Sequence, residues 1–317
     1  MSQRWSSREA ATVCAAAGSS NPAAAIQQLA ADLIDLADFA GPPFDPKRLA
    51  SIRNVREVHR VQMSSAARLI PDGAYLRIEV NQDHSPGKQN FSIDHEITHT
   101  LIPTYANELV DDEETGTFQG SREEELLCDI GAAALLLDPR WLSRFAYQAG
   151  PSLALLYSTA EAFTASLEAT ARQLVAVAPW PAAFVFWEEG FRKEEQKPLP
   201  LGQLLLPVLP DLVLPQPQIR VKHRYPTRSF PHFIPLNKSV PATSLVAAVC
   251  EDVPQTFGLE TFDFGKSTGL IDLYCENRNA PYRLGSTLQR RVISLLLPVD
   301  MHTGTPESFT AYELEAL

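Results

Sequence analysis

The sequence predicts an α+β protein of two domains, a helix-rich one with a small sheet over residues 1–180 and a mixed α/β one over residues 181–317. The chain of 317 residues is 45% hydrophobic and 21% charged, which suffices for two apolar cores and argues against disorder. Apolar residues recur at helical spacing through most of the first part. From Pro179-Trp180-Pro181 onward, prolines become frequent and β-branched or aromatic runs appear, so we place the boundary near residue 180.

The first part is expected to contain several helices and two strands. One face of the helix predicted over residues 23–39 carries Ile26, Leu29, Leu33 and Leu36. Further helices are predicted up to Gly18, near 46–50, over 88–101, over 123–137 and within 140–178. Strands are predicted over Val55–Met63 and Ala74–Val80, the second after a turn at Asp72-Gly73.

The second part contains four runs that are typical of strands. They are Phe184–Trp187, Leu204–Leu209, Leu270–Tyr274 and Val292–Val299. Together they predict a mixed α/β domain.

The charge is distributed unevenly along the chain. Residues 1–180 carry 14 Lys and Arg against 23 Asp and Glu, a net charge of −9, whereas residues 181–317 carry 13 against 15, a net charge of −2. The net charge of −11 for the whole chain argues against a protein that binds nucleic acid over its entire surface. We therefore expect any anionic partner to meet the C-terminal half.

The cysteines and the hydropathy pattern predict a cytoplasmic protein. The four cysteines are scattered without a C-x-x-C pair, so we expect reduced thiols. The N-terminus makes a poor secretory signal, and no run approaches about 18 consecutive apolar residues, which excludes a membrane span as a prediction.

An H-E-x-x-H motif spans His95 to His99 in the helix predicted over 88–101. Residues four apart project from one helical face, so both imidazoles can bind one zinc ion, at roughly 2.0–2.1 Å each. Glu96 is then placed as the general base that takes a proton from the attacking water and carries it to the leaving amine. This pattern is typical of zinc metalloproteases.

A catalytic zinc ion needs a third protein ligand, with one position left open. The helix predicted over 123–137 offers Glu125 as that ligand, and Asp129 on the same face as a hydrogen-bond partner for a ligand imidazole. Glu123 and Glu124 are rival ligands, although each points about 100° or more away from the Asp129 face. The alternative interpretation is an ordinary acidic first turn of a helix.

Cysteines give a further alternative at the open zinc position. Cys128 lies beside the presumed site, and we expect it to be a small buried hydrophobe rather than a ligand. A cysteine elsewhere, Cys14, Cys250 or Cys275, can occupy the open position and hold the enzyme inactive. Five histidines have no partner at ligand spacing and are expected to be ordinary: His59, His84, His223, His232 and His302.

The two predicted metal helices resemble those of the ImmA/IrrE family of metallopeptidases. The segment FSIDHEITHTLI resembles the family pattern F-x-I-A-H-E-x-x-H, and ELLCDIGAAALLLDP (residues 125–139) resembles E-x-x-A-N-x-F-A-A-x-L-L-M-P. The resemblance covers roughly residues 23–178. Asp94, Cys128 and Gly131 depart from the family's usual Ala, Ala and Phe, and none of these departures removes a ligand.

The resemblance implies a zincin-like first domain and a cytosolic zinc endopeptidase that cleaves a helix-turn-helix repressor to switch on an operon. Some relatives carry a C-terminal sensor domain, often GAF-like, and residues 181–317 would take that place. The layout is similar to that of peptidases that accompany anti-phage (CBASS-type) signalling operons. In that setting, single-stranded DNA is the activating cue.

A basic segment, Gln218–Lys238, has a possible nucleic-acid signature. Aromatic side chains alternate with cations there, so bases can stack while the cations follow the phosphates. The candidate contact residues are Arg220, Lys222, Arg224, Tyr225 and Arg228. The alternative is a basic loop that balances an acidic protein, whose overall field repels DNA.

Two functions of different classes follow from the sequence. The first is a zinc endopeptidase with a protein substrate. The second is a non-proteolytic sensor or binding module, in which the zinc site is structural and the C-terminal domain regulates a partner. Zinc content measured together with cleavage of a partner protein distinguishes the two.

Overall fold

The structure is a computed structural model that describes residues 4–105, 121–191, 216–265, 268–284 and 287–301. The chain divides into two compact units. Unit 1 consists of residues 1–145 and 156–177, and unit 2 of residues 146–155 and 178–317. The last residue of unit 1 is Val177, and unit 2 also includes the short segment 146–155, which lies within the first predicted domain. The domain boundary near residue 180 stays a prediction.

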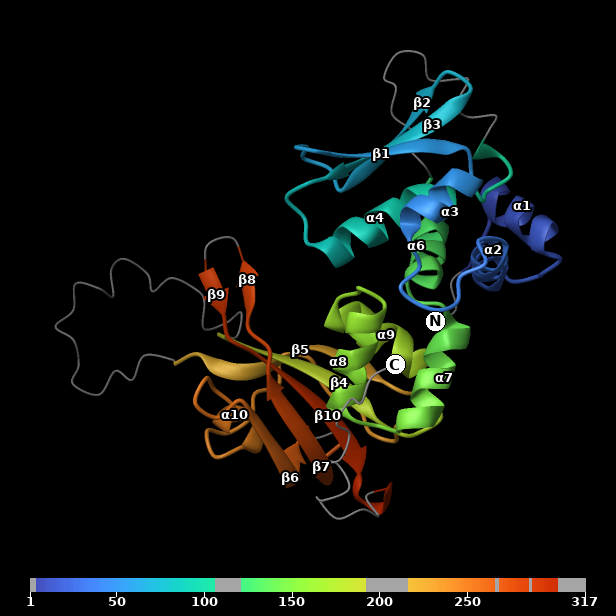
Figure 1. The fold of residues 1–317 in the computed structure, drawn as a ribbon. Coiled ribbons are helices and arrows are strands. Elements are labelled where there is room, and N and C mark those ends of the chain that lie inside the picture. Colours follow the sequence, from blue (N-terminus) through green and yellow to red (C-terminus); the bar gives the residue numbers. More distant parts are fainter. Residues whose placement is uncertain (1–3, 106–120, 192–215, 266–267, 285–286, 302–317) are drawn as a thin grey trace, which may run out of the picture. The chain divides into compact units, whose positions relative to one another are not determined.

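Helices form most of the first part of the chain (Figure 1). They are α1 (Arg8–Ala17), α2 (Pro22–Leu36), α3 (Pro46–Ile52), α4 (Pro86–His99), α6 (Arg122–Leu136), α7 (Pro139–Ala149), α8 (Leu153–Ala162) and α9 (Leu167–Val177). Most of these helices were predicted from apolar spacing. On α2, however, Leu36 is 70% exposed although it was assigned to the apolar face, because it is the last residue of the helix.

A three-stranded sheet completes unit 1. Its strands are β1 (Val55–Val61), β2 (Ala67–Asp72) and β3 (Tyr75–Asn81), in the order β1-β3-β2. β3 runs parallel to β1 and antiparallel to β2, and Gly73 with φ 63° makes the turn between β2 and β3. The sequence did not predict β2, which contains Pro71. An edge strand tolerates proline because half of its N–H groups face away from the sheet.

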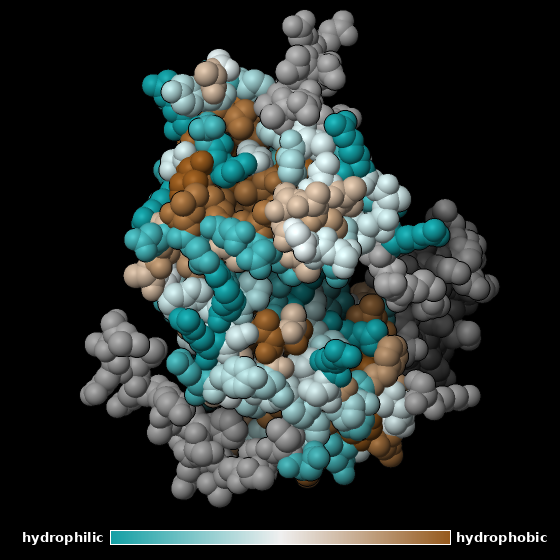
Figure 2. Space-filling model, turned by 90° about the vertical axis from the view of Figure 1, so that its right-hand side faces the viewer, coloured by the Kyte–Doolittle hydropathy of each residue, from teal (hydrophilic) through white to brown (hydrophobic). Residues whose placement is uncertain are grey.

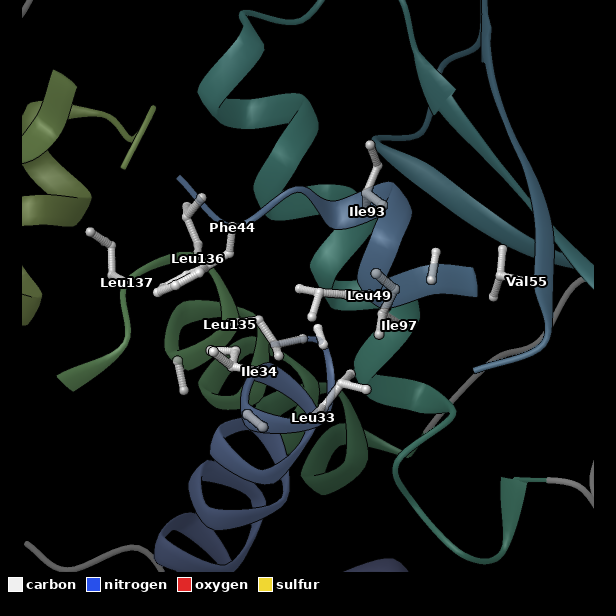
Figure 3. Packing of buried hydrophobic residues seen from close by; sticks show 14 of the residues in the cluster. Leu33, Ile34, Phe44, Leu49, Val55, Ile93, Ile97, Leu135, Leu136 and Leu137 are labelled. Carbon is white, nitrogen blue, oxygen red and sulfur yellow. The ribbon is translucent and has the colours of Figure 1, made fainter. Parts of the chain in front are cut away.

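The core of unit 1 joins the sheet to α2, α3, α4 and α6. Ile93 and Ile97 point inward from α4 and meet apolar side chains of the other helices, and Figure 3 shows this packing from close by. Among the buried contributors are Leu33, Ile34, Phe44, Leu49, Leu135 and Leu136. Because Ile93 and Ile97 anchor one face of α4 in this core, the residues on the opposite face of α4 are held in a fixed position against α6.

The close approach of α4 and α6 depends on Gly131. A Cβ atom added at this position would lie 2.3 Å from Thr98 Cγ2 and 3.1 Å from Ile26 Cγ1. The fully buried Thr98 has little room to yield, because its hydroxyl donates to the Asp94 carbonyl oxygen at 2.7 Å. No side chain larger than hydrogen therefore fits between the two helices without moving them.

We predict that Gly131→Ala destabilises unit 1 by about 1–3 kcal/mol, the usual cost of overpacking a core. The gain in helix propensity of about 1 kcal/mol offsets only part of the overpacking cost. Adding Thr98→Ser removes Cγ2 and keeps the hydroxyl, so the double variant should regain much of the loss. Urea unfolding of both variants measures the effect; a Gly131→Ala protein as stable as the wild type would contradict it.

Unit 2 is built on a five-stranded antiparallel sheet in the order β5-β4-β10-β7-β6 (Figure 1). The strands are β4 (Ala183–Gly190), β5 (Gln218–Pro226), β6 (Gln255–Asp263), β7 (Leu270–Asn279) and β10 (Arg291–Pro298). A small hairpin of β8 (Tyr282–Leu284) and β9 (Thr287–Gln289), the short helix α10 (Leu245–Ala248) and the 3-10 turn η2 (Val299–Met301) complete the described part.

Three of the four runs predicted as strands lie in this sheet, in β4, β7 and β10. The fourth, Leu204–Leu209, lies outside the described residues. One face of the sheet packs against α10 and its flanking loops, with Val185, Trp187 and Val246 in the core. A GAF-like fold for this unit stays a prediction.

Figure 2 shows one face of the molecule, on which hydrophilic residues are widespread and distinct apolar patches lie between them. All four cysteines are free, as expected. In the described residues, no helix is both long and apolar enough to cross a membrane.

Candidate metal centre

Helix α4 sets the direction of the two motif histidines. It begins after Ser85, with Pro86 in the first turn, and ends at His99. The side chain of Arg53 covers this end: its Nε donates to Thr100 Oγ1 at 3.1 Å, and its terminal nitrogen donates to the Thr100 carbonyl oxygen. A cation at a helix C-terminus stabilises the unpaired carbonyls there.

The two histidines lie one helical turn apart, with ring centroids separated by 5.1 Å. In both histidines, Nε2 points toward the carboxylate of Glu125 on α6. His95 Nε2 is 3.2 Å from Glu125 Oε2, and His99 Nε2 is 3.8 Å from Glu125 Oε1. The structure thus brings together the three residues that the sequence suggested as metal ligands.

The other ring nitrogen of each histidine is held by a second carboxylate. His95 Nδ1 is 3.1 Å from Asp129 Oδ1, the partner predicted for a ligand imidazole. His99 Nδ1 is 3.0 Å from Glu124 Oε1, and both of these side chains are buried. With Nδ1 hydrogen-bonded in each ring, Nε2 keeps its lone pair for a metal.

Glu124 is a site residue that sequence reasoning missed, since it was weighed only as a rival ligand. Glu124 is 2% exposed, whereas the Glu125 side chain is 47% exposed. Its position relative to Leu127, Cys128 and Gly131 follows helical spacing, and all four residues are buried on one side of α6. This helical spacing could have identified Glu124 from the sequence, because a glutamate on the buried face of a helix needs a hydrogen-bond partner.

The remaining rival, Glu123, has a different role. Its carboxylate accepts hydrogen bonds from the backbone N–H groups of Ser6 and Ser7 at 2.9 and 2.8 Å. These hydrogen bonds lower the pKa of Glu123 to about 2. Glu123 therefore fastens the start of α1 to the start of α6 and takes no part in the metal site.

Glu96 is adjacent to His95 and lies against β2. Burial raises the pKa of its carboxyl above the usual value, although the neighbouring imidazoles of His99 and His95 act in the opposite direction. The backbone N–H of Leu69 in β2 also donates to this carboxylate. A desolvated carboxylate with a raised pKa is a stronger base, which suits proton transfer.

The carboxylates give the site a strongly negative field. Burial opposes protonation of His95, but the hydrogen bonds to Asp129 and Glu125, with the charge of Glu96, raise its pKa to about 9. The same negative charges would attract a metal cation, and binding of the metal would displace the proton from the imidazole. The donor set of imidazole nitrogen and carboxylate oxygen is the one that zinc takes in catalytic sites, so the residues present fit zinc.

Cys128 also lies at this centre. Its side chain is fully buried, as expected, and packs with Ile26, Ile102 and Leu127. Its sulfur and one ring nitrogen from each of His95 and His99 lie within 4.8 Å of one another. Burial, followed by the charges of Glu124 and Glu125, raises the pKa of the thiol well above its usual value.

The comparisons with known proteins identify a family for the segment that contains this site. Residues 55–175 match the Peptidase_M78 family, the IrrE N-terminal-like domain. The match contains α4 and α6, and it confirms the predicted resemblance for this segment. The IrrE N-terminal-like domain is of the zinc metallopeptidase kind.

The other comparisons add little. A solved chain described as "Mycobacterium tuberculosis transcriptional regulator" is similar at a TM-score of 0.49 and 13% identity, over 86% of this chain and 75% of that one. No curated protein matches the sequence.

The residues predicted to contact nucleic acid are distributed over β5 and the loop after it. Arg220 is only 5% exposed, and its guanidinium donates to the carbonyl oxygens of Gly190 and Asn237 and to Gln218 Oε1. It therefore holds β5 in place and offers no surface for a ligand, a correction to its expected role. The cause is the pairing of β5 with β4, which turns this side chain into the protein.

The other four candidates reach the surface to different degrees. Lys222 is exposed and lies 3.4 Å from Glu188 Oε2, and Arg228 is exposed. Arg224 lies over the ring of Phe233 at 4.3 Å, and Tyr225 is half-buried beside Phe186. Four of the five candidate contacts for nucleic acid are therefore at least partly accessible: Lys222, Arg224, Tyr225 and Arg228.

Proposed function

We propose that this protein is a zinc-dependent endopeptidase. The observation that carries the proposal is the convergence of His95 Nε2 and His99 Nε2 on the Glu125 carboxylate, while Asp129 and Glu124 hold the opposite ring nitrogens. Separate carboxylates orient the two imidazoles, an arrangement typical of a metal site. The family match over residues 55–175 supports the same reading.

The residues divide the chemistry between them. His95, His99 and Glu125 would hold zinc, which when bound supplies Lewis acidity for the peptide carbonyl and lowers the pKa of water toward about 7. Glu96 takes the proton of the attacking water and delivers it to the amine that leaves. Asp129 and Glu124 keep the imidazoles in the orientation and tautomer that binding needs.

The position of β2 supports a polypeptide substrate. β2 is an edge strand of its sheet, and the N–H of Leu69 reaches Glu96 from it. An edge strand offers backbone donors and acceptors to an extended peptide. An exposed linker can adopt this extended form, whereas a folded segment cannot.

We further propose that the substrate is a helix-turn-helix repressor whose cleavage switches on a stress or anti-phage defence operon. This part rests on the resemblance of the two metal helices to ImmA/IrrE peptidases, and on the domain match. A repressor whose DNA-binding and oligomerisation parts are joined by an exposed linker would suit this site, because an extended linker can pair with an edge strand.

The test combines metal content with cleavage. The full chain is purified, its zinc is counted, and it is incubated with a helix-turn-helix repressor chosen from the genes that neighbour its own, with and without single-stranded DNA. We expect about one zinc per chain, cleavage at one linker, loss of cleavage after chelation and recovery with added zinc. Bound zinc without cleavage under any condition would overturn the peptidase and favour a non-proteolytic regulatory module.

We also propose single-stranded DNA as the activating ligand, bound through Lys222, Arg224, Tyr225 and Arg228 of unit 2. These three cations and one aromatic residue follow one another along β5 and the loop after it, and unit 2 carries less negative charge than unit 1. Cations follow the phosphates and the ring stacks on a base, by about 1–3 kcal/mol.

We predict that Arg224→Ala and Arg228→Ala each weaken binding of a labelled oligonucleotide and reduce the slope of log affinity against log salt by about 0.7–0.9. Fluorescence polarisation across a salt series measures both quantities. Arg68→Ala on β2 is the control and should bind like the wild type. Absence of binding at low salt would remove DNA from the proposal.

A further inference from the structure

We propose that unit 2 forms a symmetric dimer, in which strand β6 of one chain pairs antiparallel with β6 of a second copy. The two five-stranded sheets then continue into one another. The inference goes beyond the proposed peptidase and does not depend on the metal site, because every residue that carries it lies in unit 2.

The sheet of unit 2 has two edge strands, β5 and β6 (Figure 1). The outer edge of β5 is covered by residues 237–240 of the same chain. Val221 N–H donates to the Lys238 carbonyl oxygen at 2.9 Å, and Val240 N–H donates to that of Ile219 at 3.2 Å. In the part of the chain that the structure describes, no segment pairs with the outer edge of β6 in this way.

The direction of the β6 backbone groups follows from the two ends of its ladder with β7. Asn279 N–H donates to the Pro254 carbonyl oxygen at 2.8 Å. Phe264 N–H donates to the Gly269 carbonyl oxygen at 3.1 Å. Hydrogen-bonded pairs alternate with non-bonded pairs in an antiparallel ladder, so the even-numbered residues of β6 bond to β7. The odd-numbered residues from 255 to 263 therefore direct their N–H and C=O groups to the open edge.

Two of these odd-numbered residues have exposed apolar side chains. Phe257 is 55% exposed and Leu259 is 61% exposed. Both lie on one face of β6, since side chains alternate along a strand, whereas Phe262 on the opposite face is buried in the core. An edge strand with open backbone groups and exposed apolar side chains is a template for pairing with another strand.

The strand is complementary to itself when a two-fold axis passes through Gly258. Phe257 then faces Leu259 of the second copy, and Leu259 faces Phe257 of the second copy. Gln255 faces Thr261 in the same way, so apolar residues meet apolar ones and polar residues meet polar ones. All of these pairs join odd-numbered residues, whose backbone groups point to the open edge. A two-fold interface uses the same patch on both chains, so a self-complementary edge fits a second copy.

The charges of β6 do not oppose this pairing. The two charged residues of the strand are Glu260 and Asp263. Glu260 faces Thr256 of the second copy, and Asp263 lies beyond the paired segment, because the position opposite to it precedes Gln255. No carboxylate of β6 therefore faces another, and the repulsion between like charges that protects many edge strands is absent.

Sedimentation equilibrium of the full chain over a range of concentrations tests the dimer. We expect the wild type to reach twice the mass of one chain. Leu259→Lys and Phe257→Glu should each raise the dissociation constant by at least about tenfold, because a charge replaces an apolar contact twice in every dimer. Leu288→Lys on β9 is the matched control, since Leu288 is 56% exposed and lies outside β6, and it should dimerise like the wild type.

A mixture of the two β6 variants tests the register. In the proposed pairing, the lysine introduced at position 259 faces the glutamate introduced at position 257, while the remaining Phe257 faces the remaining Leu259. The mixture, with a fluorescent label on one variant, should therefore form mixed dimers more tightly than either variant associates with itself. Recovery in the mixture also shows that both variants are folded.

Three results would overturn the proposal. The first is a wild type that stays monomeric at every concentration. The second is dimerisation of both β6 variants at the strength of the wild type, or its loss in Leu288→Lys, because either result places the interface elsewhere. The third is failure of the mixture to associate more tightly than the separate variants, which contradicts the pairing of Phe257 with Leu259.

Discussion

Glu96→Gln is expected to retain zinc and to lose peptide cleavage by roughly 10²–10⁴-fold, the contribution of a general base. Glutamine has nearly the shape of glutamate, and its amide can still accept the hydrogen bond from the Leu69 N–H. It cannot take a proton from water. Since Glu96 is outside the proposed ligand set, the zinc stoichiometry should stay at about one per chain.

The measurement is the rate of cleavage of the partner protein, with zinc counted on the same samples. Glu57→Gln, on β1 and with its side chain half exposed, is the matched control for the loss of one carboxylate and should cleave at the wild-type rate. Cleavage by Glu96→Gln at the wild-type rate would show that another group is the base. Loss of zinc together with activity would mean that Glu96 is a ligand instead.

Glu124→Ala is expected to weaken zinc binding by about 10–100-fold, the range observed when an outer partner of a ligand histidine is removed. Glu124 and His99 are both buried, so truncation leaves a buried Nδ1–H of His99 whose carboxylate partner is gone. Asp129→Ala removes the corresponding partner of His95. Asp129 is 58% exposed, so water can replace its carboxylate and the loss should be smaller.

Competition with a chromophoric chelator measures both zinc affinities under the same conditions. Glu123→Ala is the control because Glu123 bonds to Ser6 and Ser7 at the start of α1 and stands outside the metal site. Equal losses for Glu124→Ala and Asp129→Ala would show that burial does not govern the contribution of these partners. Loss of zinc in Glu123→Ala would indicate that the start of α1 supports the site.

Much of the metal site was predictable because helical spacing is a local property. Two residues four apart share a helix face in any fold, so the pairs His95 with His99 and Glu125 with Asp129 could be read from the sequence. The strands β1 and β3 followed in the same way from alternation. To bring the predicted ligands into one site, only one further fact was required, namely that the two helices pack against each other.

Other features depended on which neighbour each residue meets. β2 was missed because proline weakens a strand pattern, and only its place at the sheet edge makes Pro71 acceptable. Arg220 looked like a cation available to DNA, but pairing of β5 with β4 directs it to backbone oxygens of its own unit.

By itself the sequence determined the two metal helices, the residues that share a face on each, and a second part rich in strands. The tertiary structure alone decided that Glu124 faces His99 and that Cys128 approaches both histidines. The physical reason is the distance between α4 and α6, which Gly131 sets by leaving room for Thr98. Such a distance depends on atoms from both helices at once, and no pattern within either helix contains it.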